Sequence, residues 1–374
     1  MSGWPTTWAA SDLLGNRVCR PTGLRPRDDP RPRSARTLPG GRMTAHGSRA
    51  RLALGADIDV LLDPADLRRG LELDVREGLT TAPRWLPPKY FYDDRGSALF
   101  EQITRLPEYY PTRTEHSILV SRAAEIARAS GADVLLELGS GSSEKTRILL
   151  DALVAAGTLG GYVPVDVSAG ALREAIAGLA LEYPDLPVQG VVADFDRHLP
   201  QLPAPGRRLV ALLGSTLGNY PPAQRAVFLR RLAGSMHGGE ALLLGLDLVK
   251  DPARLVAAYD DSAGVTAEFN RNVLRVLNRE LGADFDPRRF DHVAHWDAEQ
   301  EWIEMRLRAR SEMTVRLPAL DLEIELGPGE EIRTEISAKF RRPAFAGQLE
   351  DAGLRPEGWW TDPAGDFALV LARR

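Results

Sequence analysis

The chain has 374 residues, which is enough for one large domain or two ordinary domains with a sizeable core. Hydrophobic residues make up 44% and charged residues 26%, as in a soluble globular protein, and the net charge of −5 gives no overall electrostatic reason to bind nucleic acid or a membrane surface. A single cysteine, Cys19, excludes an intramolecular disulfide, and no apolar run is long enough to span a membrane. We therefore expect a cytoplasmic protein without nucleic-acid or membrane partners.

Residues 1–50 differ from the rest of the chain, because arginines are spread among prolines and glycines without periodic apolar residues. Such a segment cannot bury enough apolar surface to offset the entropy lost on ordering. We expect a disordered, dispensable Arg/Pro-rich leader, with Met43 as the functional start and without the pattern of a signal peptide. A targeting peptide and a nucleic-acid-binding arm are the alternatives.

An ordered pattern begins at Ile58, and Asp63 followed by Pro64 predicts the start of a helix over residues 65–78. Aromatic residues then cluster among prolines and glycines: Tyr90, Phe91, Tyr92, Phe100, Tyr109 and Tyr110. Core packing would explain this cluster, and so would a set of hydroxyl groups that donate to a small polar ligand. The spacing alone leaves both interpretations open.

A glycine-bearing turn organises the middle of the chain. The pattern predicts a buried strand over Val134–Leu138, a turn with Gly139 and Gly141, and a helix from Glu144 to about residue 157. This order places free backbone N–H groups and the positive end of a helix dipole where a ligand can bind. Because neither glycine has a side chain, a cofactor can approach the backbone closely.

Three kinds of nucleotide-binding turn are compared with this segment. A P-loop requires glycine directly before Lys145, where a carboxylate would repel a polyphosphate instead, so the P-loop is rejected. The dinucleotide fingerprint fits poorly, because its third glycine position is again Glu144. The E-x-G-x-G turn of class I methyltransferases remains, and an ordinary βα turn is its alternative.

The following strands carry suitable polar groups where they end. Residues 162–167 end near Asp166, which is placed to accept hydrogen bonds from ribose hydroxyls, and residues 188–193 lead into Asp194 and Phe195, which suit an adenine ring. Two more strands are predicted over residues 209–213 and 241–248. Alternating helices and strands between residues 114 and 250 predict an α/β fold with a doubly wound sheet.

The pattern changes after residue 250. A long helix is predicted over Val265–Leu281, followed by antiparallel strands over residues 303–309 and 320–326, which Gly327-Pro328-Gly329 turns back into a strand over residues 332–340. On that last strand, strict alternation places Ile332, Thr334, Ile336 and Ala338 on one face and Arg333, Glu335, Ser337 and Lys339 on the other. Glu335 and Ser337 would then lie about 7 Å apart, as a pair that binds a small ring or as part of a solvated sheet face.

Five segments carry a resemblance to a known family: Tyr90–Asp93, Leu106–Glu115, Glu137–Thr146, Gly214–Asn219 and Trp359–Pro363. With them, the chain from about residue 57 to its end resembles the bacterial L-histidine Nα-methyltransferases of ergothioneine biosynthesis. The resemblance implies a class I methyltransferase fold, S-adenosylmethionine as cofactor, and trimethylation of the α-amino group of L-histidine to hercynine without a metal. It also implies a role for each of twelve residues.

By this resemblance, the cofactor-binding residues are Gly139, Lys145, Asp166, Asp194 and Phe195. The substrate-binding residues are Tyr109, Asn219, Tyr259, Glu335 and Ser337, of which Glu335 and Ser337 hold the imidazole and Asn219 and Tyr259 hold the carboxylate. Tyr92 and Phe100 lie at the reacting amine and are the expected catalytic residues.

The expected organisation is a leader (1–50), a helical part of a substrate-binding domain (57–113), a methyltransferase core (114–250), inserted helices and antiparallel strands of the substrate-binding domain (251–334), and C-terminal elements that complete core and site (335–374). We expect a monomer. The alternatives are a methyltransferase for another small amine or amino acid, a nucleic-acid or protein methyltransferase of the N-P-P-Y kind, and a non-catalytic cofactor-binding regulator. A metal site at His292 and His295 is the weakest alternative, because no further ligand cluster accompanies them.

Overall fold

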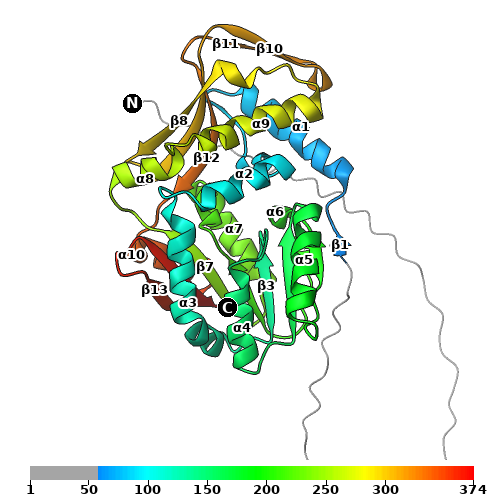
Figure 1. Cartoon of the computed structure of the whole chain (residues 1–374), viewed down its shortest axis with the longest axis vertical. Coiled ribbons are helices and arrows are strands. Elements are labelled where there is room, and N and C mark those ends of the chain that lie inside the picture. Colours follow the sequence, from blue (N-terminus) through cyan, green and yellow to red (C-terminus); the bar gives the residue numbers. More distant parts are fainter. Residues whose placement is uncertain (1–57) are drawn as a thin grey trace, which may run out of the picture. The chain divides into compact units, whose positions relative to one another are not determined.

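The structure is a computed structural model that describes residues 58–374 (Figure 1). The predicted leader over residues 1–50, with Cys19 and Met43, lies outside the described residues. The described residues all belong to one compact unit. None of the helices within residues 58–374 is both long and apolar enough to cross a membrane.

An eight-stranded sheet carries the predicted cofactor-binding turn. Its order is β1 (Ile58–Val60), β5 (Gly190–Val192), β4 (Gly161–Asp166), β3 (Val134–Leu138), β6 (Arg208–Leu212), β7 (Ala241–Asp247), β14 (Phe367–Arg373) and β13 (Arg355–Thr361). The strands from β1 to β7 are parallel to one another, whereas β14 is antiparallel to both of its neighbours. This topology confirms the predicted class I methyltransferase fold, to which β1 adds an edge strand.

Helices cover both faces of this sheet, and the central strands are buried throughout because each face packs against helices. One face packs against α3 (Tyr110–Ser130) and α4 (Thr146–Ala155), and the other against α7 (Pro222–Ser235) and α10 (Arg342–Asp351). The remaining helices of this part are α5 (Ala169–Glu182) and the short α6 (Phe195–His198). All five residues of β3 are buried, as its continuous apolar run predicts.

A second sheet of four strands carries the predicted substrate-binding pair. Its order is β2 (Arg84–Trp85), β12 (Glu331–Ala338), β9 (Trp302–Ala309) and β8 (Phe290–Asp297), and a separate hairpin pairs β10 (Met313–Leu317) with β11 (Leu322–Leu326). Around a common core these strands pack with α1 (Pro64–Thr80), α2 (Asp94–Thr104), α8 (Pro252–Tyr259), α9 (Val265–Leu281) and the 3₁₀ helix η1 (Pro88–Phe91). The prediction of α9 is confirmed at both of its ends.

The structure corrects two predictions about β12. Gly327-Pro328-Gly329 does not form a hairpin between β11 and β12, because β11 pairs with β10 and β12 pairs with β9 and β2. The predicted alternation of β12 is also wrong, since a register shift between Arg333 and Glu335 leaves Thr334 as an extra residue. Ile332 therefore packs in the core of the second sheet, whereas Ile336 packs in a core of the main sheet.

The predicted domain division stays a prediction, and the structure shows which elements its boundaries meet. The boundary after residue 113 falls within α3, and the boundary after residue 334 falls within β12. The predicted helical part of the substrate-binding domain, residues 57–113, also contributes β1 to the main sheet.

Candidate active site

The glycine turn after β3 places three of the predicted cofactor-binding residues together. Gly139 and Gly141 both have left-handed backbones, with φ of 70° and 50°. The N–H of Gly141 donates to Asp166 Oδ2 at 2.9 Å, and the N–H of Ser168 donates to Asp166 Oδ1 at 2.9 Å. A Cβ on Gly139 would lie 3.9 Å from a ring carbon of Phe195, so the bare backbone of Gly139 faces that ring.

Lys145 lies at the same edge of the sheet, just before α4, in an ion pair with Glu115. Glu115 is completely buried, and its other oxygen accepts the N–H of Gly214 at 2.8 Å. Lys145 is therefore held between the ends of β3 and β6 by a carboxylate from α3. Glu115 lies in one of the segments that carry the resemblance, but the resemblance implied no role for this residue.

Glu137 lies on β3, two residues before Gly139 of the glycine turn. Its Oε2 accepts hydrogen bonds from Thr146 Oγ1 and Tyr162 Oη, both at 2.6 Å. Burial raises the pKa of Glu137 to about 7 against the opposing effect of these two hydrogen bonds. The carboxylate of the E-x-G-x-G pattern is thus bound to the start of α4 and to β4.

Asp194 and Phe195 follow the end of β5. Asp194 caps α6, because its Oδ1 accepts the N–H of Asp196 at 2.9 Å. The Phe195 ring packs edge-on against Phe228 of α7, with 6.0 Å between the centroids. The cap and the ring contact thus fix both side chains, and the Phe195 ring lies beside Gly139 of the glycine turn.

The predicted aromatic residues form a continuous chain of ring contacts. Centroid distances are 5.6 Å between Tyr92 and Phe100, 6.2 Å between Phe100 and Tyr109, and 6.4 Å between Tyr109 and Tyr259, all in edge-to-face geometry. Phe269 of α9 contacts both Tyr92 and Phe100, at 5.5 and 6.0 Å. Its apolar helical spacing predicted a core position for Phe269, and nothing in that pattern predicted contact with the site.

Within these ring contacts, the hydroxyl groups of Tyr92 and Tyr109 form no hydrogen bond with any described residue. Burial, with a further contribution from nearby acidic groups, raises the pKa of both hydroxyls well above the ordinary tyrosine value. Both tyrosines therefore stay protonated at neutral pH and can donate a hydrogen bond to a ligand.

Glu335 and Ser337 share one face of β12, as predicted, since they lie opposite Met305 and Ile303 of β9, which point into the same core. Burial raises the pKa of Glu335 to about 7, and the charge of Lys339 opposes this shift only in part. The Ser337 and Tyr259 hydroxyl oxygens lie 2.7 Å apart. The amide orientation that satisfies both atoms of Asn219 places Nδ2 3.3 Å from Glu335 Oε1.

Tyr92 connects the two groups of predicted site residues. Its pKa is raised chiefly by burial, and the carboxylates of both Glu335 and Asp166 add to the shift. Because such charge effects fall off with distance, Tyr92 lies within electrostatic range of both Glu335 of the predicted imidazole-binding pair and Asp166, the predicted ribose-binding acid. The structure thus gathers predicted site residues from seven separate stretches of the chain into one region.

Two hollows on the surface lie away from this region. One is lined by residues around Gly353 and Arg374, and the other by residues 80–84 and 329–331. Neither contains a predicted site residue. The chemistry of the side chains, and not the size of these hollows, locates the candidate site.

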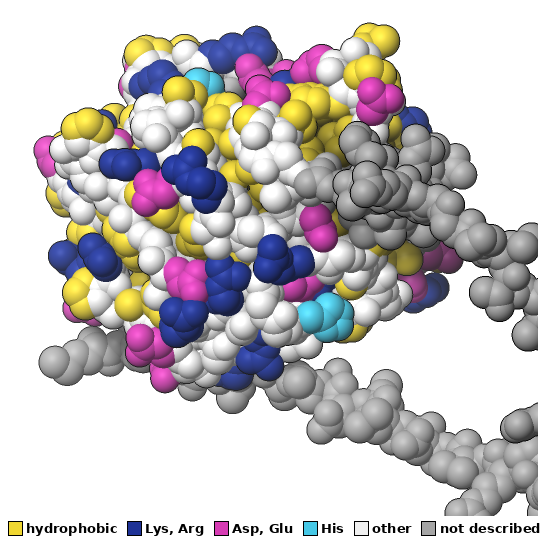
Figure 2. All heavy atoms as spheres, turned by 90° about the horizontal axis from the view of Figure 1, so that it is seen from below, with side chains coloured by type: hydrophobic (Ala, Val, Ile, Leu, Met, Phe, Trp, Pro, Cys, Tyr) yellow, Lys and Arg dark blue, Asp and Glu magenta, His cyan; other side chains and the backbone are white. Residues whose placement is uncertain are grey.

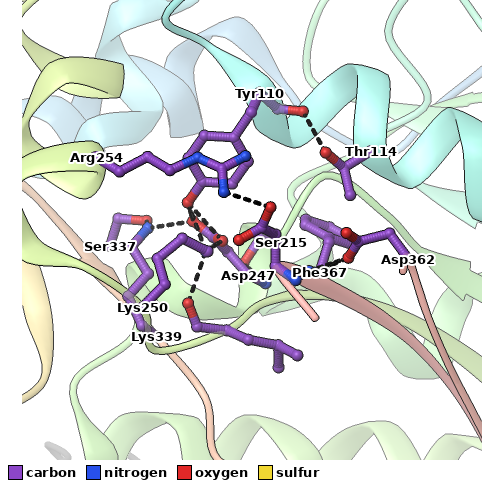
Figure 3. Close-up of polar contacts among 12 residues, drawn as sticks. Tyr110, Thr114, Ser215, Asp247, Lys250, Arg254, Ser337, Lys339, Asp362 and Phe367 are labelled. Carbon is purple, nitrogen blue, oxygen red and sulfur yellow. Dashed lines mark hydrogen bonds and ion pairs between the residues drawn. The ribbon is translucent and has the colours of Figure 1, made fainter. Parts of the chain in front are cut away.

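A buried polar network that the sequence pattern did not predict lies next to Ser337 (Figure 3). Asp247, at the end of β7, accepts a hydrogen bond from Tyr110 Oη at 2.8 Å and forms ion pairs with Lys250 and Lys339. Burial alone would raise the pKa of Asp247, but the two ammonium groups hold it below the ordinary aspartate value. The position of Asp247 at a strand end, like that of Asp166, was the available signal.

His292 of the weakest alternative serves packing. Its Nε2 lies 2.7 Å from the carbonyl oxygen of Tyr259, and its Nδ1 lies 2.8 Å from the amide nitrogen of Asn270. Within residues 58–374, no group of three or more histidine, cysteine or acidic side chains is arranged to hold a metal ion. Both ring nitrogens of His292 are therefore occupied by the fold.

Comparison with known proteins adds independent findings. The model of a family described as histidine-specific, SAM-dependent methyltransferase matches residues 71–374. The chain is 60% identical over 304 residues to the histidine N-alpha-methyltransferase of Mycolicibacterium smegmatis and 56% identical over 304 residues to that of Mycobacterium tuberculosis, in each case covering 81% of this chain and 95% of the relative. It is also 35% identical over 233 residues to ergothioneine biosynthesis protein 1 of Neurospora crassa, covering 59% of this chain and 26% of that protein.

Proposed function

The chain belongs to the family of histidine-specific, S-adenosylmethionine-dependent methyltransferases, and we propose that it transfers three methyl groups in succession to the α-amino group of L-histidine. The product is hercynine, and the reaction is the first step of ergothioneine biosynthesis. One observation carries the proposal: Glu335, a half-buried carboxylate whose only hydrogen-bond partner among the described side chains is the Asn219 amide, shares a region with Tyr92 and the glycine turn.

The cofactor would be held by the residues around the glycine turn. The space in front of Gly139 suits the cofactor, because Gly139 has no side chain to fill the space beside the Phe195 ring. Asp166 would accept from the ribose, Asp194 and Phe195 would contact the adenine, and Lys145 would contact the methionyl carboxylate. The bound sulfonium supplies an already activated methyl group, so the protein mainly has to hold the amine in line with it.

The imidazole of histidine would lie against β12. Glu335 accepts a hydrogen bond from a ring N–H, and Ser337 lies on the same strand face to meet the second nitrogen. An amino acid without a ring N–H would leave the Glu335 carboxylate buried without its partner, which disfavours its binding. Asn219, Tyr259 and Tyr109 would hold the remaining polar groups of the substrate.

The α-amine must lose a proton before it can accept a methyl group. Tyr92 stays protonated at neutral pH because burial raises its pKa, so it cannot act as a tyrosinate base. We propose that its hydroxyl or a water molecule relays the proton instead, and that the proton then passes to solvent water.

The rings of Tyr92 and Phe100 serve the later transfers. With each methyl group the ammonium loses a hydrogen-bond donor, but it keeps its charge. An aromatic face stabilises such a cation by about 1 kcal/mol. The edge-to-face contact of the two rings would thus favour completion of all three transfers.

The organisation of the protein is proposed on the same basis. We propose that residues 57–113 and 251–334 form the substrate-binding part, that residues 114–250 and 335–374 form the cofactor-binding core, and that the protein acts as a cytoplasmic monomer. Light scattering during gel filtration checks the monomer. On the face in Figure 2, lysine and arginine side chains are interspersed with acidic ones, which does not favour a nucleic-acid substrate.

Mass spectrometry of the purified protein with L-histidine and S-adenosylmethionine tests the function. We expect products heavier by one, two and three methyl groups, with the trimethylated product accumulating. A panel of other amino acids and small amines serves as competitors. Methylation of another amine in preference to histidine would replace the proposal with the alternative of a different small-amine substrate.

A further inference from the structure

Lys339 is a buried cation beside Ser337 of the predicted imidazole pair (Figure 3). Its Nζ lies 2.9 Å from Asp247 Oδ2, 2.9 Å from Tyr259 Oη and 2.8 Å from Ser337 Oγ. An ammonium group has three N–H donors and no acceptor. The three neighbours therefore use all the donors of Lys339.

The hydrogens of the two hydroxyl groups can then be counted. The oxygens of Tyr259 and Ser337 each accept a hydrogen bond from Lys339, and they lie 2.7 Å from each other. One hydroxyl hydrogen lies in the bond between them. The second cannot point at Lys339, which has no lone pair, so it must point out of the pair.

We propose that Lys339 is a positioning residue that keeps one hydroxyl hydrogen of the Ser337–Tyr259 pair directed at the substrate ring, with Tyr259 donating to Ser337 and Ser337 donating to the ring. This inference rests on the proposed function and deepens it by assigning a specificity. Ionised Glu335 can only accept, and Ser337 can only donate once its oxygen accepts from both Lys339 and Tyr259. Together they match a neutral imidazole, which has one N–H and one bare nitrogen, and they mismatch a ring that has an N–H but no second nitrogen.

Lys250 provides a matched control inside the same network. It forms an ion pair with Asp247 and donates to Tyr110 Oη at 2.6 Å, but no hydrogen bond joins it to Ser337 or Tyr259. Removing either lysine leaves Asp247 with one cation. Only the removal of Lys339 frees the hydroxyl pair to turn.

The test compares L-histidine with the two pyrrolylalanine isomers, pyrrol-2-yl and pyrrol-3-yl, each of which keeps a ring N–H and replaces one nitrogen by carbon. The measured quantity is kcat/KM for histidine divided by that for the better isomer. We expect this ratio to fall about tenfold in Lys339→Met, with the change in KM and not in kcat, and to stay within about twofold of wild type in Lys250→Met. Calorimetric titration with S-adenosylmethionine checks that both variants are folded.

A second variant keeps the test decisive if Lys339→Met does not fold. In Tyr259→Phe the Ser337 oxygen still accepts from Lys339, and its hydrogen has only the substrate to point at. The ratio should therefore be retained even though all three substrates bind more weakly. A ratio that collapses in Tyr259→Phe overturns the inference.

Two outcomes separate this inference from the proposed function. If Ser337→Ala does not weaken histidine binding, the assignment of the imidazole pair is itself wrong. If Ser337→Ala weakens histidine binding while Lys339→Met behaves like Lys250→Met, the imidazole pair stands and the role of Lys339 is wrong.

Discussion

Gly218 packs directly against the backbone of Ala338, so that a Cβ on the glycine would lie 2.9 Å from the Ala338 carbonyl oxygen and 3.1 Å from its nitrogen. This approach seats the 3₁₀ helix η3 (Thr216–Asn219) on β12. The next residue, Asn219, thereby comes within hydrogen-bonding reach of Glu335. Because Gly218 has no side chain, a loop of the main sheet can pack against the strand that carries the predicted imidazole pair.

Gly218→Ala should therefore push η3 away from β12. We expect it to lower the free energy of unfolding by about 1–3 kcal/mol, as overpacking does, and to raise the KM for histidine more than the KM for the cofactor. Urea unfolding and steady-state kinetics measure the two effects. Gly234→Ala is the control, because that helical glycine is exposed with nothing within 4 Å of its Cβ position, and alanine there should be neutral or stabilising.

Glu335→Gln should change how stability depends on pH. Burial raises the pKa of Glu335 from the ordinary 4.5 to about 7, so between these values the folded protein holds a proton that the unfolded chain has lost. The stability due to this proton is complete below pH 4.5 and is lost as the pH rises through about 7. Glutamine does not titrate, so the variant should lose about 2–3 kcal/mol less than wild type between pH 5 and pH 8.

Urea unfolding at both pH values, without histidine, measures this difference. Glu137 also has a pKa raised to about 7, but it is present in both proteins, and its effect cancels in the comparison. Equal pH dependence of the two proteins would show that Glu335 ionises normally in the folded state.

Alanine substitutions at Glu335 and Asp166 should have opposite effects on the two ligands. Glu335→Ala should weaken histidine binding by about 10- to 100-fold, which is the range for lost hydrogen bonds to a charged group, and should leave cofactor binding nearly unchanged. Asp166→Ala should weaken the cofactor and spare histidine. Isothermal titration calorimetry with each ligand separates the cases, and equal losses for both ligands in either variant would contradict the assignment.

Phe100→Leu should affect the later methyl transfers more than the first. Loss of one aromatic face costs a methylated ammonium about 1 kcal/mol, or roughly fivefold, whereas the unmethylated amine can still use hydrogen bonds. We expect monomethyl- and dimethylhistidine to accumulate in a mass-spectrometric time course. Tyr92→Phe is the control because it keeps the ring, and it should slow every transfer without changing the order in which products accumulate.

Lys145→Met tests whether Lys145 binds the cofactor or only neutralises Glu115. Because Glu115 is fully buried and Lys145 keeps 25% of its side chain exposed, the single variant should lose about 2–3 kcal/mol of stability, near the lower end for broken buried pairs. The double variant Lys145→Met/Glu115→Gln should recover most of that stability. If Lys145 also contacts the cofactor, the double variant will still bind S-adenosylmethionine weakly, and a full recovery of binding would assign Lys145 a structural role alone.

The sequence predicted what depends on local pattern. The apolar run of β3, the helical spacing of α9 and the acids at strand ends follow from burial and from the turn chemistry, and the structure has them where they were expected. The gathering of Tyr92, Asn219 and Glu335 followed only from the family resemblance, because no spacing rule brings such distant segments together. Their roles remain predictions that the experiments above address.

Other features depend on tertiary contacts that the sequence pattern does not reveal. Thr334 is hydrogen-bonded to Asn270 of α9 and to the Met305 carbonyl oxygen, contacts that accompany the bulge in β12 and that no alternation rule contains. The strands β8 and β10 were not predicted. The network around Asp247 joins Tyr110, Lys250 and Lys339, three positions whose proximity only the folded topology creates.

After β12 leaves the second sheet, the chain pairs with the main sheet. Phe340 donates its N–H to the Asp247 carbonyl oxygen at 2.9 Å, and its own carbonyl oxygen accepts the N–H of Val249 at 3.3 Å, in a parallel bridge beside β7. The segment after Ser337 is thus stitched to the main sheet within three residues. Substitution can therefore change the predicted imidazole-binding face of β12, whereas we expect that adding or deleting a residue between Ser337 and Phe340 would turn that face away from the predicted cofactor-binding residues.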